Sequence, residues 1–200
     1  MGGIELVDGT LVVGREPNEL DELAMDCSAL LDELDVAHVF VSGYVAILAG
    51  RSRSTEDIDV LVERLDDDDA GRLVDALTER GFWGPAMPLS ALGEMPAAGD
   101  PIWIAPDGDV SPHLEVTVVD DRFDRASLEG AISAVIDDAT LPIGPLELQI
   151  AYKLYLGAQR DFEDAVHLYT LFGETLSGAR LQAWSEELGV EDAYDRLKRA

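Results

Sequence analysis

The chain has 200 residues, of which 47% are hydrophobic, and its 41 acidic against 14 basic side chains give a formal charge of −27 at pH 7. This length fits one domain of ordinary size, with or without a helical appendage, and excludes a large multidomain enzyme. The apolar fraction is sufficient for a folded core, whereas the negative charge argues against nonspecific binding to nucleic acid.

The charge pattern and the cysteine content indicate the environment of the protein. Acidic side chains are scattered along the chain, and only Lys153 and Lys198 among the basic residues are lysines. This favours the hydrated surface of a halophilic protein over an acidic decoy that mimics DNA. A single cysteine, Cys27, excludes an internal disulfide and a cysteine metal cage. Because the sequence has neither a run of about 18 apolar residues nor a basic and then apolar leader, we expect a cytoplasmic protein without membrane contact.

The first part of the sequence predicts alternating strands and helices. Apolar residues on both sides of Asp8-Gly9 indicate a hairpin, and leucines at steps of three and four indicate an amphipathic helix after it. A later run alternates carboxylates with aliphatic residues, as a strand with one buried face does. The predicted elements are a hairpin over 4–13, helices over 17–35, 44–49 and 66–80, and strands over 38–42 and 57–63.

The second part is predicted to change from loop to mixed and then to helical structure. Prolines and glycines are frequent over 85–112, which therefore predicts a loop with a short strand at 102–104. The remaining predicted elements are a strand over 114–119, a helix over 127–137 capped by Ser127, and helices over 146–156, 162–172, 176–188 and 191–198. The fold class is α/β (α+β): a mixed-sheet core over 1–140 with an N-terminal hairpin, and a helical layer over 141–200 packed on the core.

Two carboxylates on the strand predicted over 57–63 indicate a metal site. Asp57 and Asp59 are two residues apart, so their side chains project from one face of the strand with about 7 Å between the backbone positions. Like charges placed so close together require a cation. Mg²⁺ commonly binds one or two protein carboxylates and completes its coordination with water and substrate phosphates. The pattern therefore predicts phosphate chemistry.

The residues just before this strand are suited to phosphate binding. Ser42 and Gly43 lie where a predicted strand turns into a helix, and exposed backbone N–H groups at such a helix start favour a phosphate. Arg51 and Arg53 follow a few residues later and carry fork-shaped donors that match phosphate oxygens.

These residues together resemble the nucleotidyltransferase superfamily, in which a Gly-Gly or Gly-Ser turn precedes Asp-x-Asp on a strand by about ten residues. Here Gly43 is followed by 13 residues and then by Asp57-Ile58-Asp59, with Ser42 in the first position of the glycine pair. The string from Arg53 to Asp59, RSTEDID, is similar to the R-x-T-x-D-I-D motif of toxin–antitoxin and abortive-infection enzymes, the AbiEii-like, minimal nucleotidyltransferase subgroup.

A second segment resembles the same subgroup. Lys153 and the string RDFED from Arg160 to Asp164 are similar to the K…R-x-K-D-x-x-D segment of its C-terminal helices, with Arg160 in the place of a lysine. The resemblance covers residues 38 to 63 and about 145 to 172, with a weaker link over 113 to 119.

The resemblance implies a nucleotidyltransferase-like fold and the transfer of a nucleoside monophosphate from a nucleoside triphosphate to a hydroxyl, with two Mg²⁺ ions. Asp57 and Asp59 would hold the metal ions, with Glu115 as the third metal-binding carboxylate, which would also position or deprotonate the attacking hydroxyl. Asp120 and Asp121 are the alternatives for the third carboxylate. The residues implied in nucleotide binding are Ser42, Gly43, Arg51, Arg53, Thr55, Lys153, Asp161 and Asp164.

The sequence leaves the acceptor and the activity open. RNA, a protein or a small molecule would each fit as the acceptor, and a cognate toxin or antitoxin would be a partner if the resemblance extends to genetic context. A catalytically degenerate protein that uses the same fold for binding or for antitoxin-like regulation is the alternative.

Histidines and aromatic residues are expected to serve the structure. The histidines are far apart in the sequence and lack the spacing of metal ligands; they are His38, His113 and His167. Without basic residues between them, the aromatic side chains are expected in the core and not on a base-stacking platform. The residues concerned are Trp83, Trp103, Tyr152 and Tyr155.

Overall fold

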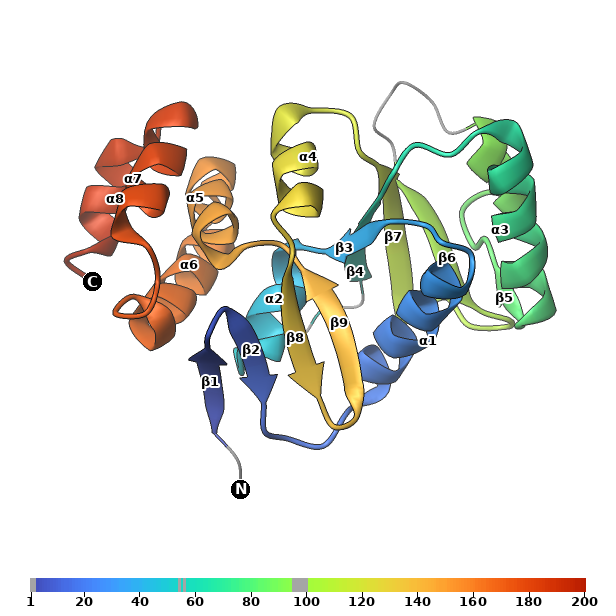
Figure 1. Ribbon diagram of the computed structural model, residues 1–200, viewed down its shortest axis with the longest axis horizontal. Helices are drawn as coiled ribbons and strands as arrows, with labels where there is room; N and C mark the ends of the chain where they lie inside the picture. Colours follow the sequence, from blue (N-terminus) through green and yellow to red (C-terminus); the bar gives the residue numbers. More distant parts are fainter. Residues whose placement is uncertain (1–2, 54, 56, 95–100) are drawn as a thin grey trace.

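The computed structural model of the chain describes residues 3–53, 55, 57–94 and 101–200. Its strands and helices follow one another along the chain and confirm the mixed α/β class (Figure 1). The strands are β1 (Ile4–Val7), β2 (Thr10–Val13), β3 (His38–Phe40), β4 (Asp57–Val62), β5 (Phe82–Trp83), β6 (Ile102–Pro106), β7 (His113–Val118), β8 (Ile132–Ile136) and β9 (Ala139–Ile143). The helices are α1 (Glu19–Glu33), α2 (Ser42–Leu48), α3 (Asp67–Glu79), α4 (Arg122–Glu129), α5 (Leu146–Leu156), α6 (Gln159–Phe172), α7 (Gly178–Glu187) and α8 (Glu191–Leu197), with a 3₁₀ helix η1 at Leu89–Glu94.

Within the described residues, nine strands form one mixed sheet in the order β1-β2-β8-β9-β3-β4-β7-β6-β5. Strand β4 lies near the middle, antiparallel to β3 and parallel to β7. The N-terminal hairpin extends the sheet because β2 pairs in parallel with β8. Residues 95–100, part of the segment expected to be mostly loop, lie outside the described residues, as do Ser54 and Glu56 of the motif before β4.

Most predicted elements are confirmed, but the helix expected over 127–137 is wrong. Helix α4 begins earlier, where Asp121 caps it by accepting hydrogen bonds from the backbone of Phe123 and Asp124, and it ends at Glu129. Strand β8 follows, with Ala134 and Ile136 fully buried. The chain then turns at Asp137, whose φ is 52°, and returns as β9.

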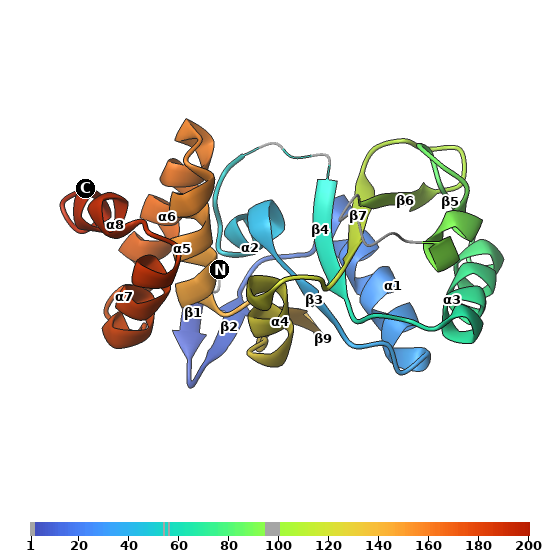
Figure 2. The ribbon, with the colours of Figure 1, turned by 90° about the horizontal axis from the view of Figure 1, so that it is seen from above.

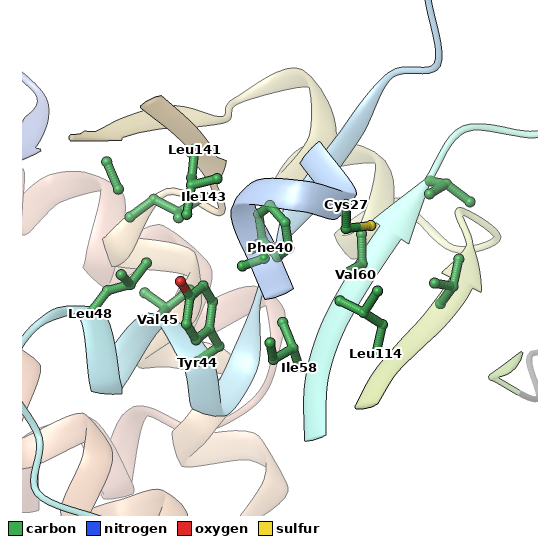
Figure 3. Packing of buried hydrophobic residues seen from close by; sticks show 14 of the residues in the cluster. Cys27, Phe40, Tyr44, Val45, Leu48, Ile58, Val60, Leu114, Leu141 and Ile143 are labelled. Carbon is green, nitrogen blue, oxygen red and sulfur yellow. The ribbon is translucent and has the colours of Figure 1, made fainter. Parts of the chain in front are cut away.

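The core lies between the sheet and helices α1 and α2. Figure 3 shows side chains from both helices and from strands β3, β4, β7 and β9 pointing toward one another. Helix α2 is short but almost wholly buried, and its Tyr44 hydroxyl donates a hydrogen bond to the buried carboxylate of Asp21 in α1. This packing fixes the β3–α2 turn next to β4.

The C-terminal helices form a separate layer. Figure 1 shows α5 to α8 gathered at one end of the molecule, with α3 at the other, and the view from above in Figure 2 agrees. This all-helical part begins at Leu146, just after β9, and α6 packs against α2. No helix in the described part of the chain is long and apolar enough to span a membrane.

Candidate active site

Strand β4 presents two carboxylates on one face and core residues on the other. Ile58 and Val60 are fully buried in the core, and the alternation of a strand turns Asp57 and Asp59 to the opposite face, where both are half-buried. The strand predicted to carry the motif is therefore present, with its predicted alternation.

The pairing of β4 with β7 adds a third carboxylate to this face. In the parallel register, Asp59 lies opposite Glu115, and Asp57 lies opposite His113. Residues opposite each other in paired strands point to the same side, and the strands are about 4.8 Å apart. Asp57, Asp59 and Glu115 therefore share one face of the sheet.

The alternatives for the third carboxylate lie elsewhere. Asp120 is beyond the end of β7, its side chain is 60% exposed, and its nearest cation is Arg64 at 3.9 Å. Asp121 is the N-cap of α4. Of these three residues, only Glu115 shares the face of Asp57 and Asp59.

The environment of Asp59 disfavours its negative charge. Burial, followed by the nearby carboxylates of Asp57 and Glu115, raises the pKa of Asp59 to about 6. A hydrogen bond with the Ser42 side chain and the charge of Lys153 act in the opposite direction. The pKa of Asp59 thus responds to the close approach of the three carboxylates.

The environment of Asp57 has the opposite effect. Burial would raise the pKa of Asp57, but the hydroxyl of Thr55 donates a hydrogen bond to its carboxylate. This bond, a hydrogen bond from its own backbone N–H, and the proximity of His113 and Arg53 together lower the pKa. Thr55 therefore holds an ionised Asp57 in place.

The turn between β3 and α2 is strained and is tied to the helical layer. Ser42 has a φ of 61°, an uncommon left-handed conformation for a residue with a side chain. Its backbone N–H donates a 2.8 Å hydrogen bond to Oε1 of Gln149 in α5. The sequence predicted an exposed N–H here, and the structure shows one that already has a partner. At Gly43, a Cβ atom would lie 2.9 Å from Nη2 of Arg53, and glycine therefore leaves room for the guanidinium.

The predicted phosphate-binding cations converge on one buried carboxylate of α6. Asp164 is fully buried and forms ion pairs with Arg51 Nε at 3.2 Å, Arg53 Nη1 at 2.5 Å and Lys153 Nζ at 3.2 Å. Lys153 also donates a 2.9 Å hydrogen bond to Asp161. The predicted residues are thus brought together, but as an internal ion cluster that joins the segment before β4 to helices α5 and α6.

A pocket of about 260 Å³ lies beside this cluster, on the carboxylate face of β4. Polar groups from β4, the β3–α2 turn and α5 reach it, and aromatic and aliphatic side chains form most of its wall. Its lining residues are Val41, Ser42, Asp59, Leu61, Phe123, Asp124, Ser127, Leu148, Gln149, Tyr152, Lys153 and Leu156. Sequence patterns did not single out Gln149 or Phe123, because neither belongs to a charged motif.

Comparisons with known proteins address the fold. No family model matches the chain, and no curated protein matches its sequence. Among solved structures, an antigenic nucleotidyltransferase-like protein from Paracoccidioides brasiliensis is similar, with a TM-score of 0.59 and 17% identity over 92% of this chain and 94% of the other. The antibiotic-resistance factor ANT(2'')-Ia is similar with a TM-score of 0.54 and 15% identity, over 91% of this chain and 97% of the other. The chain has a nucleotidyltransferase-like fold.

The carboxylate oxygens on this face of the nucleotidyltransferase-like fold are of the kind that bind a hard divalent cation. Within the residues that the structure describes, no three His, Cys, Asp or Glu side chains are already grouped closely enough to enclose a metal ion. Mg²⁺ in nucleotide-binding sites commonly uses one or two carboxylates and takes its other ligands from phosphates and water. Asp57 and Asp59 would supply the two carboxylates, and the raised pKa of Asp59 reflects its burial and then the nearby negative charge, which a cation would neutralise.

The histidines and aromatic residues of the nucleotidyltransferase-like domain differ in their environments. His38 contacts the Ser28 hydroxyl at 2.8 Å, and His167 contacts the carbonyl of Ala49 at 2.8 Å, as expected of structural histidines. The expectation of a core position is wrong for Trp103 and Tyr155, which are 36% and 56% exposed. The indole of Trp103 stacks on the ring of His113. Trp103 lies opposite Glu115 in the β6–β7 pairing, and its side chain is therefore on the same face of the sheet as His113 and Glu115.

Proposed function

We propose that this protein is a Mg²⁺-dependent nucleotidyltransferase that moves a nucleoside monophosphate from a nucleoside triphosphate to a hydroxyl. One observation carries the proposal. Asp59 lies opposite Glu115 and two residues from Asp57, while it also lines a pocket with Ser42 and Lys153. Metal-binding carboxylates and phosphate-binding groups would thus meet at one place.

The pocket offers a separate region for each part of a nucleotide. The triphosphate would lie near Ser42 and Lys153, next to Asp59. The nucleoside would lie against Phe123 and Tyr152, whose rings supply flat apolar surfaces.

The three carboxylates would have different tasks in the reaction. Asp57 and Asp59 would hold Mg²⁺, which when bound stabilises negative charge on the transferring phosphoryl group and on the leaving pyrophosphate. Glu115 would accept the proton of the acceptor hydroxyl as its oxygen bonds to the α-phosphorus. The bond from that phosphorus to the bridging oxygen of the β-phosphate would break, and pyrophosphate would leave.

Lys153 would be the cation of the ion cluster that contacts the triphosphate. Lys153 is 3% exposed and is shared between Asp161 and Asp164. A triphosphate in the pocket would offer Lys153 a further anionic partner without displacing Asp164, which also keeps Arg53 next to Gly43. Asp161 and Asp164 would therefore position Lys153.

The acceptor and the biological setting are part of the same proposal. The motif resemblance favours a toxin–antitoxin or defence role. The acidic composition favours the cytoplasm of a halophilic cell. RNA, a protein or a small molecule would each provide a hydroxyl. The charge of −27 disfavours an extended nucleic-acid footprint, since phosphate contacts depend on Lys and Arg.

A catalytically degenerate binding protein is the second candidate, and one observation favours it. The Ser42 N–H is occupied by Gln149, and Arg51, Arg53 and Lys153 are all occupied by carboxylates of α6. A protein of this kind would bind a nucleotide or a partner and would release no pyrophosphate.

Nucleotide binding tests the proposal directly. The affinity of each of the four common nucleoside triphosphates would be measured by calorimetry at high salt, with Mg²⁺ and with EDTA. We expect Mg²⁺-dependent binding that Asp57→Asn and Asp59→Asn each weaken at least tenfold. Asp120→Asn removes the same charge from an exposed site and serves as the matched control. Equal affinity in all four proteins would refute the proposed site, and binding without pyrophosphate release would support the degenerate protein.

A further inference from the structure

The third histidine, His113, is buried beside the carboxylate face without a hydrogen-bond partner. It is 6% exposed, and within the described part of the chain neither Nδ1 nor Nε2 has a partner. Leaving a buried polar group unsatisfied typically costs about 1–3 kcal/mol, so such groups require an explanation. The other two histidines, His38 and His167, make the contacts that a structural histidine makes.

The surroundings of His113 orient its ring toward the carboxylates. Trp103 stacks on one side of the imidazole, with 4.3 Å between ring centroids and 29° between the planes. His113 lies opposite Asp57 in the β4–β7 register and two residues before Glu115 on β7. Four side chains, those of Asp57, Asp59, His113 and Glu115, therefore occupy adjacent positions on one face of two neighbouring strands.

The contact between His113 and Glu115 is longer than a hydrogen bond and slightly longer than the spacing of two ligands on one ion. Nε2 of His113 is 3.6 Å from Oε1 of Glu115, which exceeds the usual hydrogen-bond range of about 2.7–3.2 Å. Nitrogen and oxygen ligands at about 2.0–2.2 Å from one ion lie about 3.0–3.5 Å apart. A shift of a few tenths of an ångström would place both atoms around a common ion.

We propose that His113 is a nitrogen ligand for a second divalent ion held beside Glu115, and that this second position prefers a transition-metal ion such as Mn²⁺, Co²⁺ or Zn²⁺, whereas Asp57 and Asp59 hold Mg²⁺. The inference rests on the proposed function, since the ion would lie on the acceptor side of the same carboxylates. Imidazole nitrogen is a poor ligand for Mg²⁺ and a common ligand for transition metals. Among the described residues, no three His, Cys, Asp or Glu side chains are close enough together to hold a metal ion. A nearby carboxylate would therefore have to move toward His113 and Glu115 to complete the site.

The contribution of Trp103 would be to hold the imidazole in its orientation. Histidine ligands are usually oriented by a hydrogen bond from the second ring nitrogen to a carboxylate or carbonyl. Within the described residues that nitrogen has no partner here, so the stacked indole takes over this task. Trp103→Phe should preserve the stack and therefore the nitrogen ligand.

Pulsed electron paramagnetic resonance of the whole protein with Mn²⁺ tests the inference. The spectra would be recorded with less Mn²⁺ than protein, at high salt so that ions on the acidic surface are screened. We expect ¹⁴N coupling to Mn²⁺ in the wild-type protein and its loss in His113→Gln, whereas His167→Gln, the matched control, retains it. His113→Gln should weaken Mn²⁺ binding at least about tenfold, since even the loss of a group that only orients a ligand costs about 10–100-fold, and should leave Mg²⁺ binding unchanged.

The outcomes separate this inference from the proposed function. Absence of ¹⁴N coupling in the wild-type protein, or coupling that persists in folded His113→Gln, would overturn the inference. If His113→Gln does not fold, coupling that survives in both His38→Gln and His167→Gln still assigns the ligand to His113. The proposed function fails on a different result, nucleotide binding with Mg²⁺ that is unaffected by Asp57→Asn and Asp59→Asn.

Discussion

The raised pKa of Asp59 makes the stability of the metal-free protein depend on pH. Burial, with Asp57 and Glu115 nearby, raises this pKa from an ordinary 3.8 to about 6. Because the folded-state pKa is the higher one, the stabilisation is present at acid pH and is lost as the pH rises through about 6. The difference between 3.8 and about 6 corresponds to about 3 kcal/mol of stability at most, and roughly half of it falls between pH 5 and pH 8.

Asp59→Asn should reverse this loss, since the variant has no charge to bury. Urea unfolding of both proteins in EDTA, at constant high salt, gives the free energy of unfolding at pH 5 and pH 8. We expect the variant to gain about 1 kcal/mol more over the wild type at pH 8 than at pH 5.

Asp57→Asn is the matched comparison, because the pKa of Asp57 is lowered. Stability from a lowered carboxyl pKa is present above its unfolded value and is lost only as the pH falls through the folded value. Asp57 is therefore ionised in both states from pH 5 to pH 8, and its replacement acts on the pH dependence only through Asp59, whose pKa the charge of Asp57 raises. Burial is the larger cause of that raised pKa, so Asp57→Asn should change the pH dependence in the same direction as Asp59→Asn but by less. An Asp59→Asn effect that does not change with pH, or an Asp57→Asn effect that changes with pH as much as that of Asp59→Asn, would refute the electrostatic reasoning.

Three other predictions concern the helical layer. Asp164→Asn leaves buried cations without their shared partner and should lower the free energy of unfolding, measured in urea, by about 3–5 kcal/mol. Asp161→Asn keeps the Lys153–Asp164 pair and should lower it by less. Equal losses in the two variants would contradict this prediction. Gln149→Leu leaves the Ser42 N–H unpaired and should cost about 1–3 kcal/mol. If a phosphate then binds that N–H, nucleoside triphosphate should raise the Tm of Gln149→Leu by more than that of the wild type, and an equal rise would count against a phosphate at Ser42.

The parts of the fold that follow local periodicity could be predicted from the sequence. Helix α1 follows its leucine stripe, and β4 follows the alternation of Asp57, Ile58, Asp59 and Val60. The helix expected over 127–137 failed because the segment fits two periods: Leu128, Ile132 and Val135 recur at helical spacing, whereas Ile132, Ala134 and Ile136 alternate as in a strand. Pairing with β9 and with β2 decides in favour of the strand, and β2 lies far away in the sequence.

The candidate site was only partly predictable for the same reason. Asp57 and Asp59 are neighbours on one strand, so their shared face follows from the sequence. The position of Glu115 opposite Asp59 depends on the β4–β7 register, which only a motif resemblance indicated. Likewise, the burial of His113 beneath Trp103 comes from a loop-rich segment whose pairing no local pattern indicates.

A crystal structure of the protein with Mg²⁺ and a non-hydrolysable nucleoside triphosphate would test the central claim most directly. The account predicts a metal ion that bridges the carboxylates of Asp57 and Asp59 to the phosphates, with Lys153 on the triphosphate and the Glu115 carboxylate facing the α-phosphorus. A nucleotide bound away from these side chains, or a bound nucleotide whose metal ion contacts neither aspartate, would contradict it.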